Sequence, residues 1–148
     1  IEISLYLEKE GLSFYEKGAK NVADQRVKNM FTRLAEEERE HIQTLQTKIQ
    51  FLQPAISGKG KTRRHLDLFI SNELKGKVFQ VSATKAVQKF KSDMDALEFG
   101  IESEKRSIEI LSSLLEKEKK LDVKAIFSHL MVEEKKHLAL LEDLKKKI

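Results

Sequence analysis

The chain has no cysteine among its 148 residues, and this absence excludes several kinds of site. Disulfides, thiolate zinc sites, iron–sulfur clusters and cysteine nucleophiles all need a thiol. The absence is compatible with a reducing compartment, and we expect a cytoplasmic protein. No apolar run reaches the length of a membrane span and no basic-then-apolar leader is visible, so we expect no membrane association.

Residues that break helices are also scarce. One proline, six glycines, no tryptophan and 35% charged residues are typical of an all-α helical bundle. The length suits one compact domain with a sizeable core. The 28 Lys and Arg against 24 Asp and Glu give a net charge of +4. Because the basic residues alternate with glutamates along the expected helices, we interpret them as solvated faces and expect no nucleic-acid binding.

Apolar residues recur at helical spacing in four segments, which predicts four amphipathic helices. We expect the first two, at about residues 3–20 and 25–52, to form one hairpin with Asp24 as the second N-cap. Pro54 is expected to stop the second helix. The third and fourth helices, at about 93–119 and from the turn at 121–122 to the C-terminus, form a second hairpin over about 93–148.

A long crossover over residues 53–92 would join the hairpins. It begins with a basic loop, 57–64, followed by a short helix at 65–74, an extended piece at 76–81 and another short helix at 83–90. The basic run from Lys59 to Arg64 could dock an acidic partner, although an ordinary solvated loop is the interpretation we favour.

Two Glu-x-x-His pairs lie on the inward stripes of the second and fourth helices. Glu38 and His41 are three residues apart, and so are Glu134 and His137; on a helix each pair shares one face. One such pair in a glutamate-rich chain is weak evidence for a metal site. Two pairs separated by 96 residues are harder to attribute to chance.

The same 96-residue offset relates the apolar stripes of the two hairpins without a gap, which predicts an internal repeat. The matching pairs are Leu5 and Ile101, Leu12 and Ile108, Ala19 and Leu115, Val27 and Val123, Phe31 and Phe127, Leu34 and Leu130, Ile42 and Leu138, Leu45 and Leu141.

The offset also selects one glutamate on each remaining helix. Glu8 rather than Glu10, and Glu104 rather than Glu102, lies on the apolar stripe, and each precedes its Glu-x-x-His glutamate by 30 residues. At 1.5 Å per residue all four glutamates stand roughly 21–24 Å from their hairpin turn. They should therefore meet in one layer at mid-bundle.

Four carboxylates cannot stay buried and ionised without compensation. Two divalent ions would cancel their formal charge, and carboxylates with two imidazoles suit iron or manganese. A Glu from each of two helices and a Glu-x-x-His from each of the other two is the ligand arrangement described for ferritin-like bundles. The sequence thus predicts a two-metal site whose ligands are Glu8, Glu38, His41, Glu104, Glu134 and His137.

Three further residues could belong to the site or to the scaffold. Tyr15 lies two turns after Glu8, so it could be ordinary core or a phenol that hydrogen-bonds a metal carboxylate. His65, in the basic segment, and His129, off the inner stripe, are interpreted as structural.

At these residues the chain resembles the rubrerythrin-like branch of the ferritin-like superfamily. The resemblance is carried by Glu8-Lys9-Glu10-Gly11-Leu12-Ser13-Phe14-Tyr15, by Leu34-Ala35-Glu36-Glu37-Glu38-Arg39-Glu40-His41, and by their second-half counterparts around Glu104 and Glu134. It covers about two thirds of the chain and implies a four-helix bundle with a di-iron site. Glu38 and Glu134 would bridge the irons, with Glu8 and Glu104 as terminal ligands and one histidine on each iron.

The resemblance also implies a function. Members of the family commonly reduce hydrogen peroxide, cycle between diferrous and diferric states, and often form homodimers. Three features depart from the pattern: the rubredoxin-type domain cannot be present in a chain without cysteine, Ser107 replaces an extra glutamate, and Leu111 replaces a second tyrosine.

Three hypotheses follow. The first is a di-iron oxidoreductase that acts on peroxide or dioxygen with an external electron donor. The second is an iron-handling protein, such as a ferroxidase, sensor or carrier, without repeated turnover. The third is a non-redox interaction bundle that holds zinc or no metal.

Overall fold

The computed structural model describes the backbone of residues 1–56 and 90–148, and the side chains of these except 51–56. This part of the chain forms four helices and no strand: α1 (Glu2–Asn21), α2 (Gln25–Ile56), α5 (Asp93–Lys117) and α6 (Leu121–Lys147). The predicted all-α four-helix bundle is confirmed. The expected basic loop at 57–64, His65 and the expected elements at 65–74, 76–81 and most of 83–90 lie outside the described residues.

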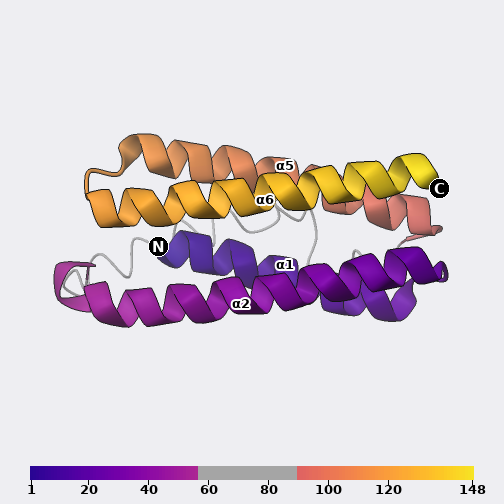
Figure 1. The fold of residues 1–148 in the computed structure, drawn as a ribbon, viewed down its shortest axis with the longest axis horizontal. Helices are drawn as coiled ribbons and strands as arrows, with labels where there is room; N and C mark the ends of the chain where they lie inside the picture. Colours follow the sequence, from indigo (N-terminus) through magenta and orange to yellow (C-terminus); the bar gives the residue numbers. More distant parts are fainter. Residues whose placement is uncertain (57–89) are drawn as a thin grey trace.

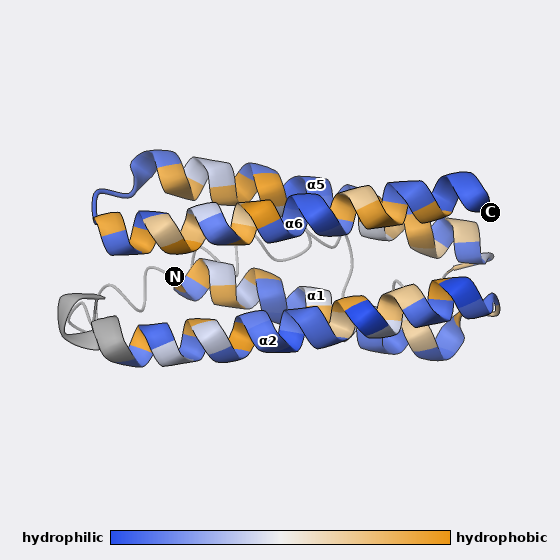
Figure 2. Cartoon of the chain, in the orientation of Figure 1, coloured by the Kyte–Doolittle hydropathy of each residue, from blue (hydrophilic) through white to orange (hydrophobic). Residues whose placement is uncertain are grey.

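The helices associate as two antiparallel hairpins. α1 lies along α2 and α5 along α6, and the two hairpins face each other with α2 beside α6 and α1 beside α5 (Figure 1). Hydrophobic and hydrophilic residues alternate along each helix (Figure 2), as expected when one face of each helix is buried. No helix in the described part of the chain is both apolar enough and long enough to cross a bilayer.

Local sequence signals account for the N-terminal ends of two helices, α2 and α5. Asp24 caps α2, because its side chain accepts a hydrogen bond of 2.8 Å from the backbone N–H of Arg26. Ser92 caps α5 by accepting from the N–H of Asp95 at 3.2 Å. The expectation that Pro54 ends α2 is wrong, because the helix continues to Ile56. A proline removes one intrahelical hydrogen bond, and a terminal turn can tolerate that loss.

One end of the bundle is held together by polar contacts between the hairpins. Asp93, at the start of α5, accepts hydrogen bonds from the backbone N–H groups of Ala23 at 3.0 Å and Asp24 at 2.6 Å. Arg26 donates to the backbone carbonyl of Lys147 at 3.2 Å. The α1–α2 turn is thereby joined to both helices of the second hairpin.

Most residues of the predicted inward stripes are buried, but α1 differs in part from the prediction. Leu12 and Ala19 of α1 are only half-buried, whereas Phe14 is completely buried. α1 packs against both α2 and α5, so its buried face is wider than one stripe. The Phe14 ring packs on Phe31 of α2 and Phe99 of α5, with centroids 5.5 and 5.1 Å away.

Gly18 sets the distance between α1 and α2 beside this cluster. A Cβ at Gly18 would lie 2.7 Å from Cδ2 of Phe31, whereas a Cβ at Gly100 would lie 3.3 Å from Phe14 and 3.4 Å from Leu141. The first distance is a clash with a fully buried ring, and the second is a tight contact.

We predict that Gly18→Ala destabilises the protein by about 1–2 kcal/mol, because the overlap costs more than the gain in helix propensity of about 1 kcal/mol. The matched control Gly100→Ala should leave stability unchanged or raise it slightly. Thermal unfolding of both variants measures the difference. Equal melting temperatures for Gly18→Ala and the original protein would contradict this account of the close approach.

Candidate metal centre

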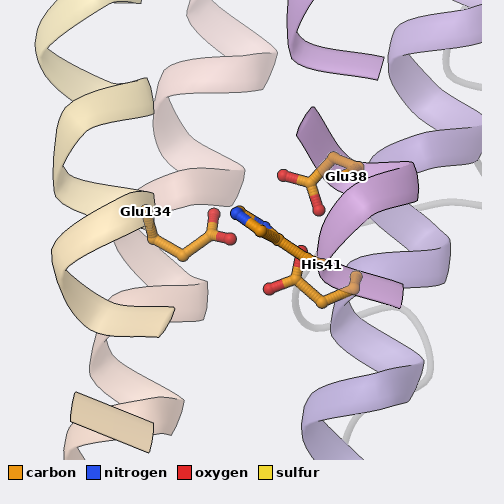
Figure 3. Close-up of side chains that lie close together, drawn as sticks. Glu38, His41 and Glu134 are labelled. Carbon is orange, nitrogen blue, oxygen red and sulfur yellow. The ribbon is translucent and has the colours of Figure 1, made fainter. Parts of the chain in front are cut away.

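All four helices contribute a side chain to one buried cluster at mid-bundle. Figure 3 shows Glu38 and His41 of α2 and Glu134 of α6 pointing toward one another. None of the six predicted ligands is more than 9% exposed. The structure therefore brings together every residue of the predicted set: Glu8, Glu38, His41, Glu104, Glu134 and His137.

The cluster divides into two groups whose ligand atoms lie within 4.8 Å of one another. The first contains Glu8 and His41, and the second contains Glu104 and His137. Glu38 and Glu134 belong to both. This is the set of side chains described for ferritin-like two-metal bundles, a Glu from each of two helices and a Glu-x-x-His from each of the other two.

Both histidines turn Nδ1 toward the carboxylates. Nδ1 of His41 lies 3.2 Å from Oε2 of Glu8 in a hydrogen bond. Nδ1 of His137 lies 3.1 Å from Oε1 of Glu38, but the groups are not aligned for a hydrogen bond. A short contact without a hydrogen bond leaves this nitrogen available as a ligand.

The outer nitrogen of each histidine faces a glutamate of the opposite hairpin, which the sequence did not lead us to expect. Nε2 of His137 lies 3.7 Å from Oε2 of Glu37, and Nε2 of His41 lies 3.9 Å from Oε2 of Glu133. These distances are too long for hydrogen bonds, so each carboxylate lies near the imidazole as a charge and not as a bonded partner. Glu37 and Glu133 are themselves 96 residues apart, so the repeat held a signal for both.

Tyr15 is fully buried and bonded to the cluster. Its hydroxyl donates to Oε1 of Glu104 at 2.5 Å. Burial, with the nearby charge of Glu104, raises the pKa of Tyr15 well above its usual value, so the phenol stays protonated as a donor. Of the two interpretations from spacing, this contact favours a residue that supports a carboxylate. The repeat counterpart Leu111 is buried and carries no such group.

Gly11 makes room for one of the shared carboxylates. A Cβ at this position would lie 3.3 Å from the carboxylate carbon of Glu38. His129 is exposed, as its place off the inner stripe indicated. Its ring centroid nevertheless lies 6.5 Å from that of His41.

Without cations the cluster is electrostatically costly. Burial, followed by the charge of Glu8, raises the pKa of Glu38 well above its usual range. Burial and the charges of Glu104 and Glu38 do the same for the pKa of Glu134. Burial alone would lower the pKa of His41, but its hydrogen bond to Glu8 and the surrounding carboxylates raise it.

The residues present fit a pair of divalent cations. Among the described residues, Oε2 of Glu104, Oε1 of Glu134 and both ring nitrogens of His137 are buried without a hydrogen-bond partner. Unsatisfied buried acceptors and donors are rare in folded proteins and call for a ligand or ion. Carboxylate oxygens and imidazole nitrogens are suitable donors for iron, manganese or zinc.

We predict that the metal-free protein loses stability as the pH rises from about 5.5 to 8. A carboxyl group with a raised pKa in the folded state stabilises fully below its unfolded pKa, and this contribution is lost as the pH rises through the folded pKa. Glu38, Glu134 and His41 share this sign, whereas Glu8, whose pKa is lowered, acts only at more acidic pH. Each pKa unit corresponds to about 1.4 kcal/mol.

Thermal unfolding of chelator-treated protein at the two pH values measures this effect. Glu38→Gln should reduce the pH dependence of the melting temperature. Glu40→Gln, at an exposed position of the same helix, should preserve it. Manganese or zinc should offset the loss at pH 8. Greater stability of the metal-free protein at pH 8 than at pH 5.5 would contradict the prediction.

Comparisons with known proteins agree with this geometry. The model of the rubrerythrin family matches residues 1–145. No curated protein and no solved structure showed significant similarity to the chain. The family implies iron binding, and the carboxylate and histidine cluster is compatible with it. Because the match extends over nearly the whole chain, the protein belongs to the rubrerythrin family.

Proposed function

We propose that the protein is a di-iron carboxylate oxidoreductase that acts on peroxide or dioxygen. The observation that carries the proposal is the pair of ligand groups that share Glu38 and Glu134. Glu8 and His41 would complete one iron site, and Glu104 and His137 the other. Two ferrous ions held there would supply the two electrons, and solvent the two protons, that reduction of hydrogen peroxide to two water molecules requires.

The protein's own residues prepare the site for this chemistry. Tyr15 holds Oε1 of Glu104 by a hydrogen bond while Oε2 of Glu104 has no hydrogen-bond partner among the described residues. Buried leucines stand about one turn before and one turn after the Glu-x-x-His pairs in sequence and surround them with apolar side chains: Leu34, Leu45, Leu130 and Leu141. A low-dielectric surrounding strengthens every interaction between the carboxylates and a cation.

We expect an external electron donor for this domain, because residues 1–148 contain no cysteine with which to hold an iron–thiolate centre. A homodimer, a cytoplasmic location and the absence of nucleic-acid and membrane partners stay predictions from the sequence. The internal repeat also stays a prediction.

A second candidate is iron handling, in which iron is bound and oxidised once without repeated turnover. One observation favours it: the buried Ser107 stands at the position where, by the resemblance, peroxide-reducing relatives carry a glutamate. This difference concerns turnover rather than iron binding. Turnover is therefore the property that separates the two candidates.

We predict that metal-free protein binds two Fe(II) per chain under anaerobic conditions. Added peroxide should then be consumed faster than by the same amount of free iron. With an excess of external reductant, continued consumption indicates an oxidoreductase, and a single stoichiometric oxidation indicates iron handling. Binding of zinc alone, or of no metal, would leave a non-redox interaction bundle and contradict both.

Substitution identifies the ligands in the same assay. Glu38→Ala and His137→Ala should weaken metal binding about tenfold or more, because loss of a direct ligand costs at least as much as loss of an outer partner. Glu40→Ala and Glu142→Ala, at exposed positions of α2 and α6, are the matched controls and should retain two irons. Unchanged metal content in Glu38→Ala would refute the assigned site.

A further inference from the structure

Gly11 is the glycine of the described part of the chain that lies against the metal centre. The three heavy atoms nearest to a Cβ at this position all belong to Glu38: the carboxylate carbon and Oε2, each at 3.3 Å, and Cγ at 3.7 Å. A Cβ at Gly18 would instead clash with an aromatic ring, and one at Gly100 would lie 3.3 Å from Phe14. The space that a side chain would fill at Gly11 is therefore bounded by the carboxylate of Glu38.

A side chain at Gly11 would have to displace this carboxylate. The 3.3 Å approach is tighter than ordinary van der Waals contact, so a methyl group there would push the carboxylate away by a few tenths of an ångström. Glu38 is 2% exposed, so its carboxylate has no solvent to move into. Metal–ligand distances in a given kind of site vary by only about 0.2 Å, so a displacement of this size matters to a bound cation.

The two oxygens of Glu38 face different parts of the centre. Oε1 lies 3.1 Å from Nδ1 of His137, which belongs to one of the two ligand groups. Oε2 is the oxygen that faces Gly11, and Gly11 follows Glu8 by three residues on the same face of α1. An ionised carboxylate has two acceptor oxygens, so in a bridge each can serve one cation. Oε2 is then the oxygen left for the cation held by Glu8 and His41.

Helix stability does not explain a glycine at this position. Gly11 lies in the interior of α1, where alanine is more favourable than glycine. The matching position 96 residues later is Ser107, which is buried and carries a side chain. Glu134, the other shared glutamate, thus has no glycine at the corresponding place in the sequence. The two shared carboxylates are not equivalent, and the missing side chain belongs to the Glu38 half.

We propose that Gly11 is a positioning residue: by leaving out a side chain it lets Oε2 of Glu38 reach the metal position held by Glu8 and His41. The inference rests on the proposed function, because it requires a cation at that position. It adds that a residue without a ligand atom of its own controls the occupancy of one of the two metal positions.

Titration of the metal-free protein with Mn(II) tests this role, because the electron paramagnetic resonance signal of free Mn(II) measures how much metal stays unbound. The original protein should bind two Mn(II) per chain. Gly11→Ala should bind one of them as before and the other about tenfold or more weakly, as found for residues that support metal ligands. Gly100→Ala, whose new Cβ also has its nearest neighbour at 3.3 Å, is the matched control and should bind both unchanged.

Thermal unfolding separates a positioning role from a packing defect. Metal-free Gly11→Ala should melt at the same temperature as the original protein or higher, because alanine favours the helix and no cation holds the Glu38 carboxylate in place. A lower melting temperature, together with equal weakening of both metal positions, would show a general packing defect and contradict the proposal.

Combined variants show which metal position is affected. In a protein that carries His41→Ala, the metal that stays is the one on the His137 side, and adding Gly11→Ala should change its affinity less than about twofold. In a protein that carries His137→Ala, adding Gly11→Ala should weaken the remaining metal about tenfold.

Two results would overturn the role of Gly11 while leaving the metal centre intact. One is binding of two Mn(II) by Gly11→Ala with the affinities of the original protein. The other is a tenfold loss on adding Gly11→Ala to His41→Ala. Failure of the original protein to bind two metal ions would instead overturn the proposed function, and the role of Gly11 with it.

Discussion

The burial of four carboxylates at the middle of an apolar bundle is the constraint on which the rest of the structure depends. Glu8, Glu38, Glu104 and Glu134 are each no more than 5% exposed. Each ionised carboxylate would cost several kcal/mol if it were buried there alone. The four carboxylates must therefore either take up protons or share cations. Burial and the neighbouring carboxylates raise the pKa values of Glu38 and Glu134, which favours the first solution when no cation is bound. Their position in both ligand groups would allow the second.

Several stabilising interactions lie between this layer and the α1–α2 turn. In sequence, Phe14 and Gly18 lie between Glu8 and the α1–α2 turn, and backbone N–H groups of that turn donate hydrogen bonds to Asp93. Such an arrangement lets the middle carry a destabilising charge cluster while the hairpins stay in register. Functional centres commonly reduce stability in this way, and metal binding restores it by mass action.

Much of this could be predicted because helical periodicity and a fixed offset are local properties of the sequence. The offset selected Glu8 over Glu10 and Glu104 over Glu102, and the structure brings both into the cluster. Contacts between the hairpins could not be predicted, because they depend on how one hairpin is rotated against the other. Glu37 facing His137, and His129 near His41, are of this kind. The predicted end of α2 was wrong because a proline near a terminus weakens a helix without always ending it.

The central claim is that Glu38 and Glu134 are shared by two metal ions. A crystal structure of the iron-loaded protein, with anomalous diffraction recorded on both sides of the iron edge, tests it most directly. The account predicts two iron peaks per chain, one beside Glu8 and His41 and one beside Glu104 and His137, with a carboxylate of Glu38 and of Glu134 contacting both. A single peak, or iron bound without these two glutamates, would contradict it.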